Sequence, residues 1–268
     1  MDTLSTINLD IFPKEREKRL KEIYRYSLFE TMIYRSNLWM HEHRVSWIAE
    51  VVAGLLKPHL SLDIEKAKTL ALVHDDAEII TGDVQLGHKA QMTKEQLAEL
   101  DREEERAIET LSAQYPSEIN GYSYKTLLLE ALHKNTAEAQ VCSYADKFDA
   151  YCEGIHEQLA GNITLLTSTI LYTRFFAQVD SKLPLISEAL NKAEPSPFIR
   201  PFIQSPSPGK QITVAMYKEF SGKPHTEESI NKTTERYPFY DAWKKLVLER
   251  GGEEGKRWLL IQKETLPT

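Results

Sequence analysis

The sequence predicts an all-α protein. Apolar residues recur at spacings of three and four over most of residues 1–194, which is typical of amphipathic helices. No segment before residue 195 has the strict alternation of a half-buried strand, and the chain carries no internal repeat. Five prolines then fall between residues 195 and 208. The sequence therefore predicts a helical core over residues 1–194 and a C-terminal extension over residues 195–268.

Local signals predict the first three helices. One spans about Lys14 to Tyr34, and a second runs from near His43 to Leu56 and ends before Pro58. Its expected buried residues are Trp47, Ile48, Val51, Val52 and Leu55. The third helix is capped by Ser61 or Asp63, carries apolar spacing on to His74 and Glu78, and stops at Thr81-Gly82.

Further helices are predicted over residues 93–114, 125–133, 137–159, 164–179 and 184–192. In the extension, residues 211–217 and 257–262 have strand-like composition and flank a predicted helix over residues 226–248. The extension is therefore expected to contain a small β element.

Composition excludes several classes of function. The formal net charge of -7 gives no reason to expect binding to nucleic acid or to an anionic membrane. Two cysteines, Cys142 and Cys152, are too few for a disulfide framework and are expected to be buried thiols in a reducing compartment. Neither a signal-peptide pattern nor an apolar run of membrane-spanning length occurs. A cytoplasmic location follows as the expectation.

Charged residues interrupt the apolar helices at three places. His74 and Asp75 end an apolar run, Asp146 lies in another, and His43 opens the second helix. A lone His43 is typical of a helix end, and a lone Asp146 is typical of a salt bridge. Together with His74 and Asp75, however, they supply two imidazoles and two carboxylates. Such a mixed set suits one divalent transition metal (Mn, Co, Fe, Ni or Zn) better than calcium. Glu78 lies one turn after His74 on the same predicted face.

These residues resemble the HD-domain metal-dependent phosphohydrolases, whose hallmark is H…HD…D. Within that superfamily the chain is most similar to bacterial 5′-deoxynucleotidases of the YfbR type, over about residues 20–165. The resemblance rests on Glu42-His43, on His74-Asp75-x-x-Glu78 followed by Thr81-Gly82-Asp83, and on Ala145-Asp146. It implies an HD-domain helical bundle.

The resemblance also implies roles for single residues. The metal would be held by His43, His74, Asp75 and Asp146. Glu78 and Asp83 would be catalytic: they would transfer the proton and orient the leaving oxygen. Arg35 and Lys89 would bind the phosphate, although both are equally typical of surface charges. Asp83 is likewise typical of a residue that caps a turn. For the family's Arg-Trp pair the nearest counterpart is Tyr24-Arg25-Tyr26. The remaining imidazoles near these motifs, His41, His88 and His133, do not fit the spacing of the multi-histidine HD subfamilies, so one metal is expected.

The expected function is hydrolysis of (deoxy)nucleoside 5′-monophosphates by a metal-activated water. One alternative is a nucleoside triphosphate or (p)ppGpp phosphohydrolase, and another is a non-catalytic metal- or nucleotide-binding module. The expected partner is a small nucleotide substrate, and the amphipathic helices are compatible with a homodimer.

Overall fold

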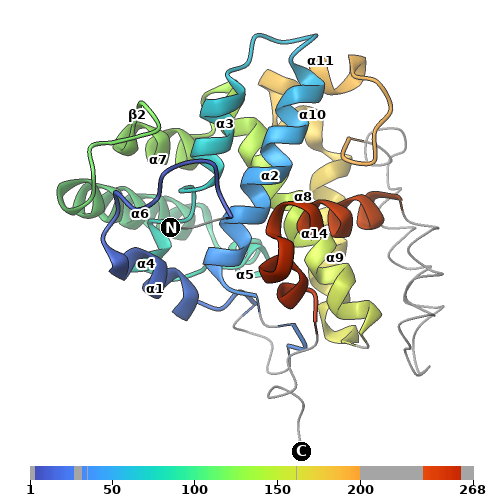
Figure 1. Ribbon diagram of the computed structural model, residues 1–268, viewed down its shortest axis with the longest axis horizontal. Coiled ribbons are helices and arrows are strands. Elements are labelled where there is room, and N and C mark those ends of the chain that lie inside the picture. The colour runs from blue at the N-terminus through green and yellow to red at the C-terminus, as the bar shows by residue number, and fades with distance from the viewer. Residues whose placement is uncertain (1–3, 27–31, 35, 161, 200–237, 261–268) are drawn as a thin grey trace, which may run out of the picture. The chain divides into compact units, whose positions relative to one another are not determined.

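The computed structural model describes residues 4–26, 32–34, 36–160, 162–199 and 238–260 (Figure 1). Within these residues the protein is all-α apart from one short antiparallel pair, β1 (Glu118–Ile119) and β2 (Tyr122–Ser123). The predicted fold class is confirmed. No helix among the described residues has the length and apolar character needed to cross a bilayer.

The chain divides into two compact units, and two long helices run from the first into the second. The first unit comprises Met1–Ser27, Ser36–Gly54 and Ser61–Asp146, and the second Leu28–Arg35, Leu55–Leu60 and Lys147–Thr268. The long helices are α2 (Leu38–Leu56) and α8 (Ala137–Leu159). The domain boundary expected near residue 195 falls inside the second unit and stays a prediction.

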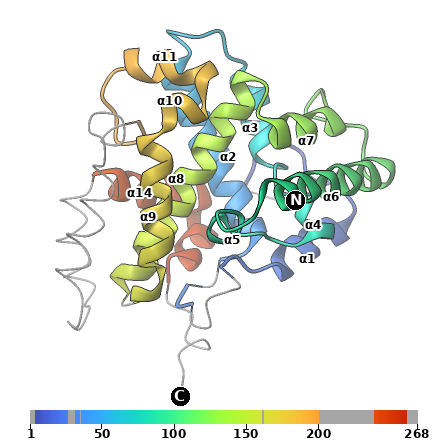
Figure 2. The ribbon, with the colours of Figure 1, turned by 180° about the vertical axis from the view of Figure 1, so that it is seen from behind.

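The first unit holds most of the predicted functional residues. Besides the opening parts of α2 and α8, it contains α1 (Lys14–Glu22), α3 (Ile64–Ala71), α4 (Glu78–Thr81), α5 (Leu86–Lys89), α6 (Lys94–Gln114) and α7 (Tyr124–His133). In both views α6 lies beside α7 and α4, and α4 also contacts α1 (Figures 1 and 2). A capping box at Thr93 and Gln96 starts α6, as its sequence pattern favours.

The second unit contains the rest of α8, then η1 (Ile163–Leu165), α9 (Leu166–Ala177), α10 (Val179–Lys182), α11 (Pro184–Lys192) and α14 (Pro238–Trp258). Polar groups of α14 bond to α8: Trp243 Nε1 donates to Asp149 Oδ1 at 2.7 Å, and the Tyr240 hydroxyl meets His156 Nδ1 at 2.5 Å. The two helices are therefore joined by buried polar contacts as well as by apolar packing. Cys152, and Cys142 of the first unit, are buried thiols, as expected.

Several predicted helix ends were wrong. The helix expected to reach Tyr34 ends at Glu22, because Ile23 is extended and Tyr24 forms a β-bridge with Asn37. The second helix begins at Leu38, five residues before His43. In the extension, Arg257 and Trp258 belong to α14, so no strand begins there, and the strand expected over residues 211–217 lies outside the described residues.

The third helix also stops earlier than predicted. It ends at Ala71, and the chain continues in tight turns in which Val73 N bonds to Leu70 O at 3.1 Å and Asp76 N to Val73 O at 3.0 Å. Hydrogen bonds between residues three apart wind the backbone more tightly than an α-helix. His74 and Asp75 therefore project from a turn rather than from a regular helical face.

Candidate metal centre

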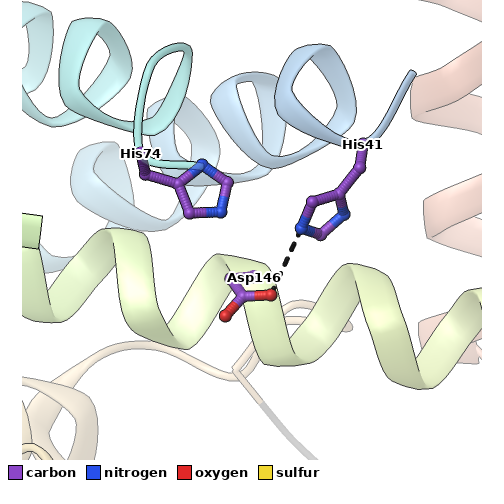
Figure 3. A group of neighbouring side chains, drawn as sticks. All are labelled: His41, His74 and Asp146. Atoms are coloured by element: carbon purple, nitrogen blue, oxygen red, sulfur yellow. Dashed lines mark ion pairs between the residues drawn. The ribbon is translucent and has the colours of Figure 1, made fainter. Parts of the chain in front are cut away.

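Three elements of the first unit bring His41, His74 and Asp146 together. His41 comes from the first turn of α2, His74 from the turn after α3, and Asp146 from the middle of α8, and the three side chains point toward one another (Figure 3). Their nearest ligand atoms all lie within 4.8 Å of one another. His41 Nε2 is 3.3 Å from Asp146 Oδ1.

Asp75 completes this cluster. Its Oδ1 lies 3.3 Å from His74 Nε2, and its Oδ2 lies 3.6 Å from His41 Nε2. Burial alone would raise the pKa of Asp75, but the imidazoles of His74 and His41 lower that pKa below its usual range. Asp75 is therefore a carboxylate at neutral pH, and the cluster consists of two imidazoles and two carboxylates.

The hydrogen bonding of His74 suits a metal ligand. A carbonyl oxygen only accepts, so the 2.8 Å contact of His74 Nδ1 with Ala71 O places the ring proton on Nδ1. Burial lowers the pKa of His74, which keeps the imidazole neutral and leaves a lone pair on Nε2. This Nε2 is buried and makes no hydrogen bond with any residue that the structure describes. A buried acceptor beside two carboxylates fits a divalent cation.

The expectation that His43 would be a ligand is corrected by the packing of α2. His43 Nδ1 donates to Trp39 O at 2.8 Å, and its ring lies 4.4 Å from the Trp39 ring and 6.3 Å from the Trp47 ring, measured between centroids. Trp47 in turn donates to Leu4 O at 3.1 Å. His43 thus faces the N-terminal segment of the chain, whereas His41 faces the metal centre.

The prediction of His43 followed the Glu42-His43 motif. Of the five residues expected to be buried on α2, Trp47, Val51 and Leu55 lie on the stripe that extends back to His43, whereas Ile48 and Val52 lie on the stripe of His41. In the structure Val51 and Leu55 are half-exposed. His41, Val45, Ile48 and Val52 form one buried stripe of α2, each at most 1% exposed.

Arg25 is the cation of the described residues that stands nearest to the cluster. Its Nη1 lies 3.8 Å from Asp75 Oδ2, and its side chain is 9% exposed. Tyr26, next to it, has a positive φ of 56°, and Arg25 N bonds to Ser36 O at 3.0 Å, so the backbone holds this segment in a defined turn. The correspondence of Tyr24-Arg25-Tyr26 to the family's Arg-Trp pair stays a prediction.

Glu78 and Asp83 form an acidic pair beside the cluster. Burial raises the pKa of Glu78 well above its usual range, and the charges of Asp75 and Asp83 raise it further. Burial likewise raises the pKa of Asp83, although Arg25 lowers it. Gly82 joins the end of α4 to Asp83 with φ 77°, a conformation that glycine adopts without strain. The Thr-Gly-Asp sequence thus turns Asp83 back toward the site.

The other predicted residues lie in different places. Lys89, in α5, is close enough for its charge to lower the pKa of Glu78 and Asp83. His88 is exposed, and His133 Nε2 pairs with Glu105 Oε1 at 3.5 Å, so neither joins the cluster. Arg35 lies outside the described residues.

Comparison with known proteins identifies relatives of this chain. Residues 16–180 match the family model described as "5′-deoxynucleotidase YfbR-like". A 5′-deoxynucleotidase from Erwinia tasmaniensis is 29% identical over 163 residues, which cover 60% of this chain and 80% of that protein. A 5′-deoxynucleotidase from Shewanella oneidensis is 31% identical over 152 residues, which cover 56% of this chain and 76% of that protein.

The fold has a counterpart among solved structures. The PH0347 protein from Pyrococcus horikoshii superposes with a TM-score of 0.54 at 22% identity, covering 71% of this chain and 96% of that one. At this identity the likeness supports the fold alone.

Proposed function

Because the chain belongs to the YfbR-like 5′-deoxynucleotidase family, we propose that it is a metal-dependent phosphoric monoester hydrolase acting on (deoxy)nucleoside 5′-monophosphates. The observation that carries this proposal is the convergence of His41, His74, Asp75 and Asp146 on one point. These four residues would hold one divalent metal. When bound, such a metal polarises a phosphoryl oxygen and makes water a better nucleophile at neutral pH.

Two nitrogen and two oxygen ligands suit Mn, Fe, Co, Ni or Zn. His88 and His133, the other imidazoles near the motifs, lie apart from the cluster.

The chain's own residues supply binding and proton transfer. Arg25 and Lys89 carry the positive charge near the cluster, and a guanidinium binds a phosphate with two parallel hydrogen bonds. Burial raises the pKa of Glu78 well above its usual range, and a carboxyl group with a raised pKa is suited to carry the proton in acid-base catalysis. Asp83 would orient the leaving oxygen or the sugar. Arg35 stays a predicted phosphate ligand.

The experiment is a phosphate-release assay on metal-free protein reloaded with each of the five candidate ions. The substrate panel contains ribo- and deoxyribonucleoside 5′-monophosphates, the corresponding 3′-monophosphates and triphosphates, and (p)ppGpp. The proposal expects inorganic phosphate from 5′-monophosphates only when metal is present. Pyrophosphate or triphosphate as the main product would establish the alternative phosphohydrolase.

Two variants complete this experiment. Asp146→Asn removes a carboxylate ligand and should abolish both metal binding and phosphate release. His133→Gln changes an exposed imidazole on another part of the first unit and should leave both unchanged. Metal binding without phosphate release from any substrate would instead support a binding module. The homodimer and the cytoplasmic location stay predictions.

A further inference from the structure

A buried arginine lies beneath the metal centre. Arg16, in α1, is 1% exposed. Its Nε donates to Asp76 Oδ1 at 3.0 Å and to Oδ2 at 2.9 Å, and its Nη2 donates to Glu42 Oε2 at 3.0 Å and to Leu72 O at 2.9 Å. The Tyr124 hydroxyl donates to Asp76 Oδ2 at 2.8 Å. One guanidinium thus ties α1 to two other segments of the first unit, and Asp76 links both to α7.

The partners of Arg16 are sequence neighbours of the proposed metal ligands. Glu42 follows His41, Asp76 follows Asp75, and the Leu72 carbonyl belongs to the turn that leads into His74. Three of the four proposed ligands therefore lie within two residues of a group that Arg16 holds. A shift of the guanidinium would displace α2 and the His74-Asp75 turn relative to each other.

The geometry of this contact requires a guanidinium. Arg16 reaches Asp76, Glu42 and Leu72 through two nitrogens of a rigid planar fork, whereas the ammonium group of lysine offers a single centre. The Phe12 ring packs 4.7 Å from Arg16 Cζ and closes one side of the site. Buried ion pairs of this kind contribute little net stability, because desolvation offsets most of the attraction. Their better attested use is to specify one arrangement among several, which here is the arrangement of the ligand-bearing segments.

We propose that Arg16 is a positioning residue of the metal centre: through Glu42, Asp76 and Leu72 it sets the distance between His41 and the His74-Asp75 turn. This inference rests on the proposed metal-dependent function. Arg16 touches neither metal nor substrate in the arrangement described above. Its loss should therefore weaken metal binding and slow turnover without changing the KM for the nucleotide at saturating metal.

The test compares Arg16→Lys with Arg19→Lys in the full-length protein. Arg19 lies on the same helix, is exposed, and donates to Ile79 O at 2.6 Å, outside the Arg16 network. The Kd for Mn²⁺ and Co²⁺ is measured by competition with a fluorescent chelator, and kcat and KM are measured separately. Arg16→Lys should raise the metal Kd by about 10- to 100-fold, the effect typical of groups that orient ligands. Arg19→Lys should leave it at the wild-type value.

A purely structural role for Arg16 would have a different signature. Arg16→Lys would then lower the melting temperature while the folded fraction kept wild-type metal Kd and kcat, and this result overturns the proposal. If Arg16→Lys does not fold, Tyr124→Phe removes one donor to Asp76 and should raise the metal Kd by about 2- to 10-fold. An unchanged Kd in that folded variant also overturns the proposal. If the wild-type protein binds no metal, the proposed function itself is refuted. If the wild-type protein has metal-dependent activity and Arg16→Lys keeps the wild-type metal Kd and kcat, only the role of Arg16 is refuted.

Discussion

Replacing the two neighbouring histidines of α2 one at a time provides a sharp test of the metal centre. His41→Gln removes an imidazole whose Nε2 lies 3.3 Å from Asp146 and 3.6 Å from Asp75. Groups that merely orient a ligand change metal affinity by about 10- to 100-fold, so loss of the ligand itself should weaken binding by more than about 100-fold. Phosphate release at micromolar metal should disappear with it.

His43→Gln is the matched control, two residues away on the same helix. It removes two ring contacts, with Trp39 at 4.4 Å and with Trp47 at 6.3 Å between centroids. Each such aromatic contact contributes about 0.5–1.5 kcal/mol, so the free energy of unfolding should fall by about 1–3 kcal/mol. Metal affinity should stay at the wild-type value, because His43 does not face the cluster.

Both quantities are measurable on the same samples. Metal Kd is obtained by competition with a chelator, or from the visible absorption of bound Co²⁺, and stability by urea unfolding of the metal-free protein. If His43→Gln lost metal binding while His41→Gln kept it, the orientation of α2 derived above would be wrong. Equal loss in both variants would show that the assay reports stability rather than ligation.

Three further outcomes are expected. Glu78→Gln should retain bound metal but lower kcat by about 10²- to 10⁴-fold, since it removes the group proposed to carry the proton; unchanged turnover would exclude that role. Metal at 100 times its Kd should raise the free energy of unfolding by about 2.7 kcal/mol. This should be measured as a higher melting temperature that a chelator reverses. An identical melting temperature with and without metal would contradict a metal site in the native state. Burial, together with the charge of Glu157, raises the pKa of Tyr34 from 10.0 to about 12. Because the unfolded chain loses this proton first, the free energy of unfolding should fall as the pH rises from 10 to about 12. That loss should shrink in Tyr34→Phe, and an equal loss in both proteins would show that Tyr34 does not cause it.

Short-range patterns in the sequence were enough to predict the fold class and part of the centre. The helical periodicity, the His74-Asp75 pair and Asp146 are all features of single segments, and the structure brings these three side chains together. Thr81-Gly82-Asp83 was informative for a similar reason, because the turn at Gly82 depends on the conformational freedom of one residue.

The choice between His41 and His43 required the tertiary structure. Residues two apart on a helix point roughly 200° from each other, so the two imidazoles lie on opposite faces of α2. Both faces of α2 are buried at His41 and His43. The face of His41 lies against the cluster, and the face of His43 lies against Trp39 and Trp47, so hydrophobicity alone did not distinguish the two histidines.

The contacts of Arg16 were also outside the reach of sequence patterns. Arg16 meets Asp76 across 60 positions of the chain. No local period records such a contact, because it depends on how α1 and the following turn pack against the His74-Asp75 segment. The His74-Asp75 pair at the end of an apolar run is thus a property of the sequence. The four-residue centre, and the guanidinium beneath it, are properties of the fold, since only packing places distant segments within hydrogen-bonding distance.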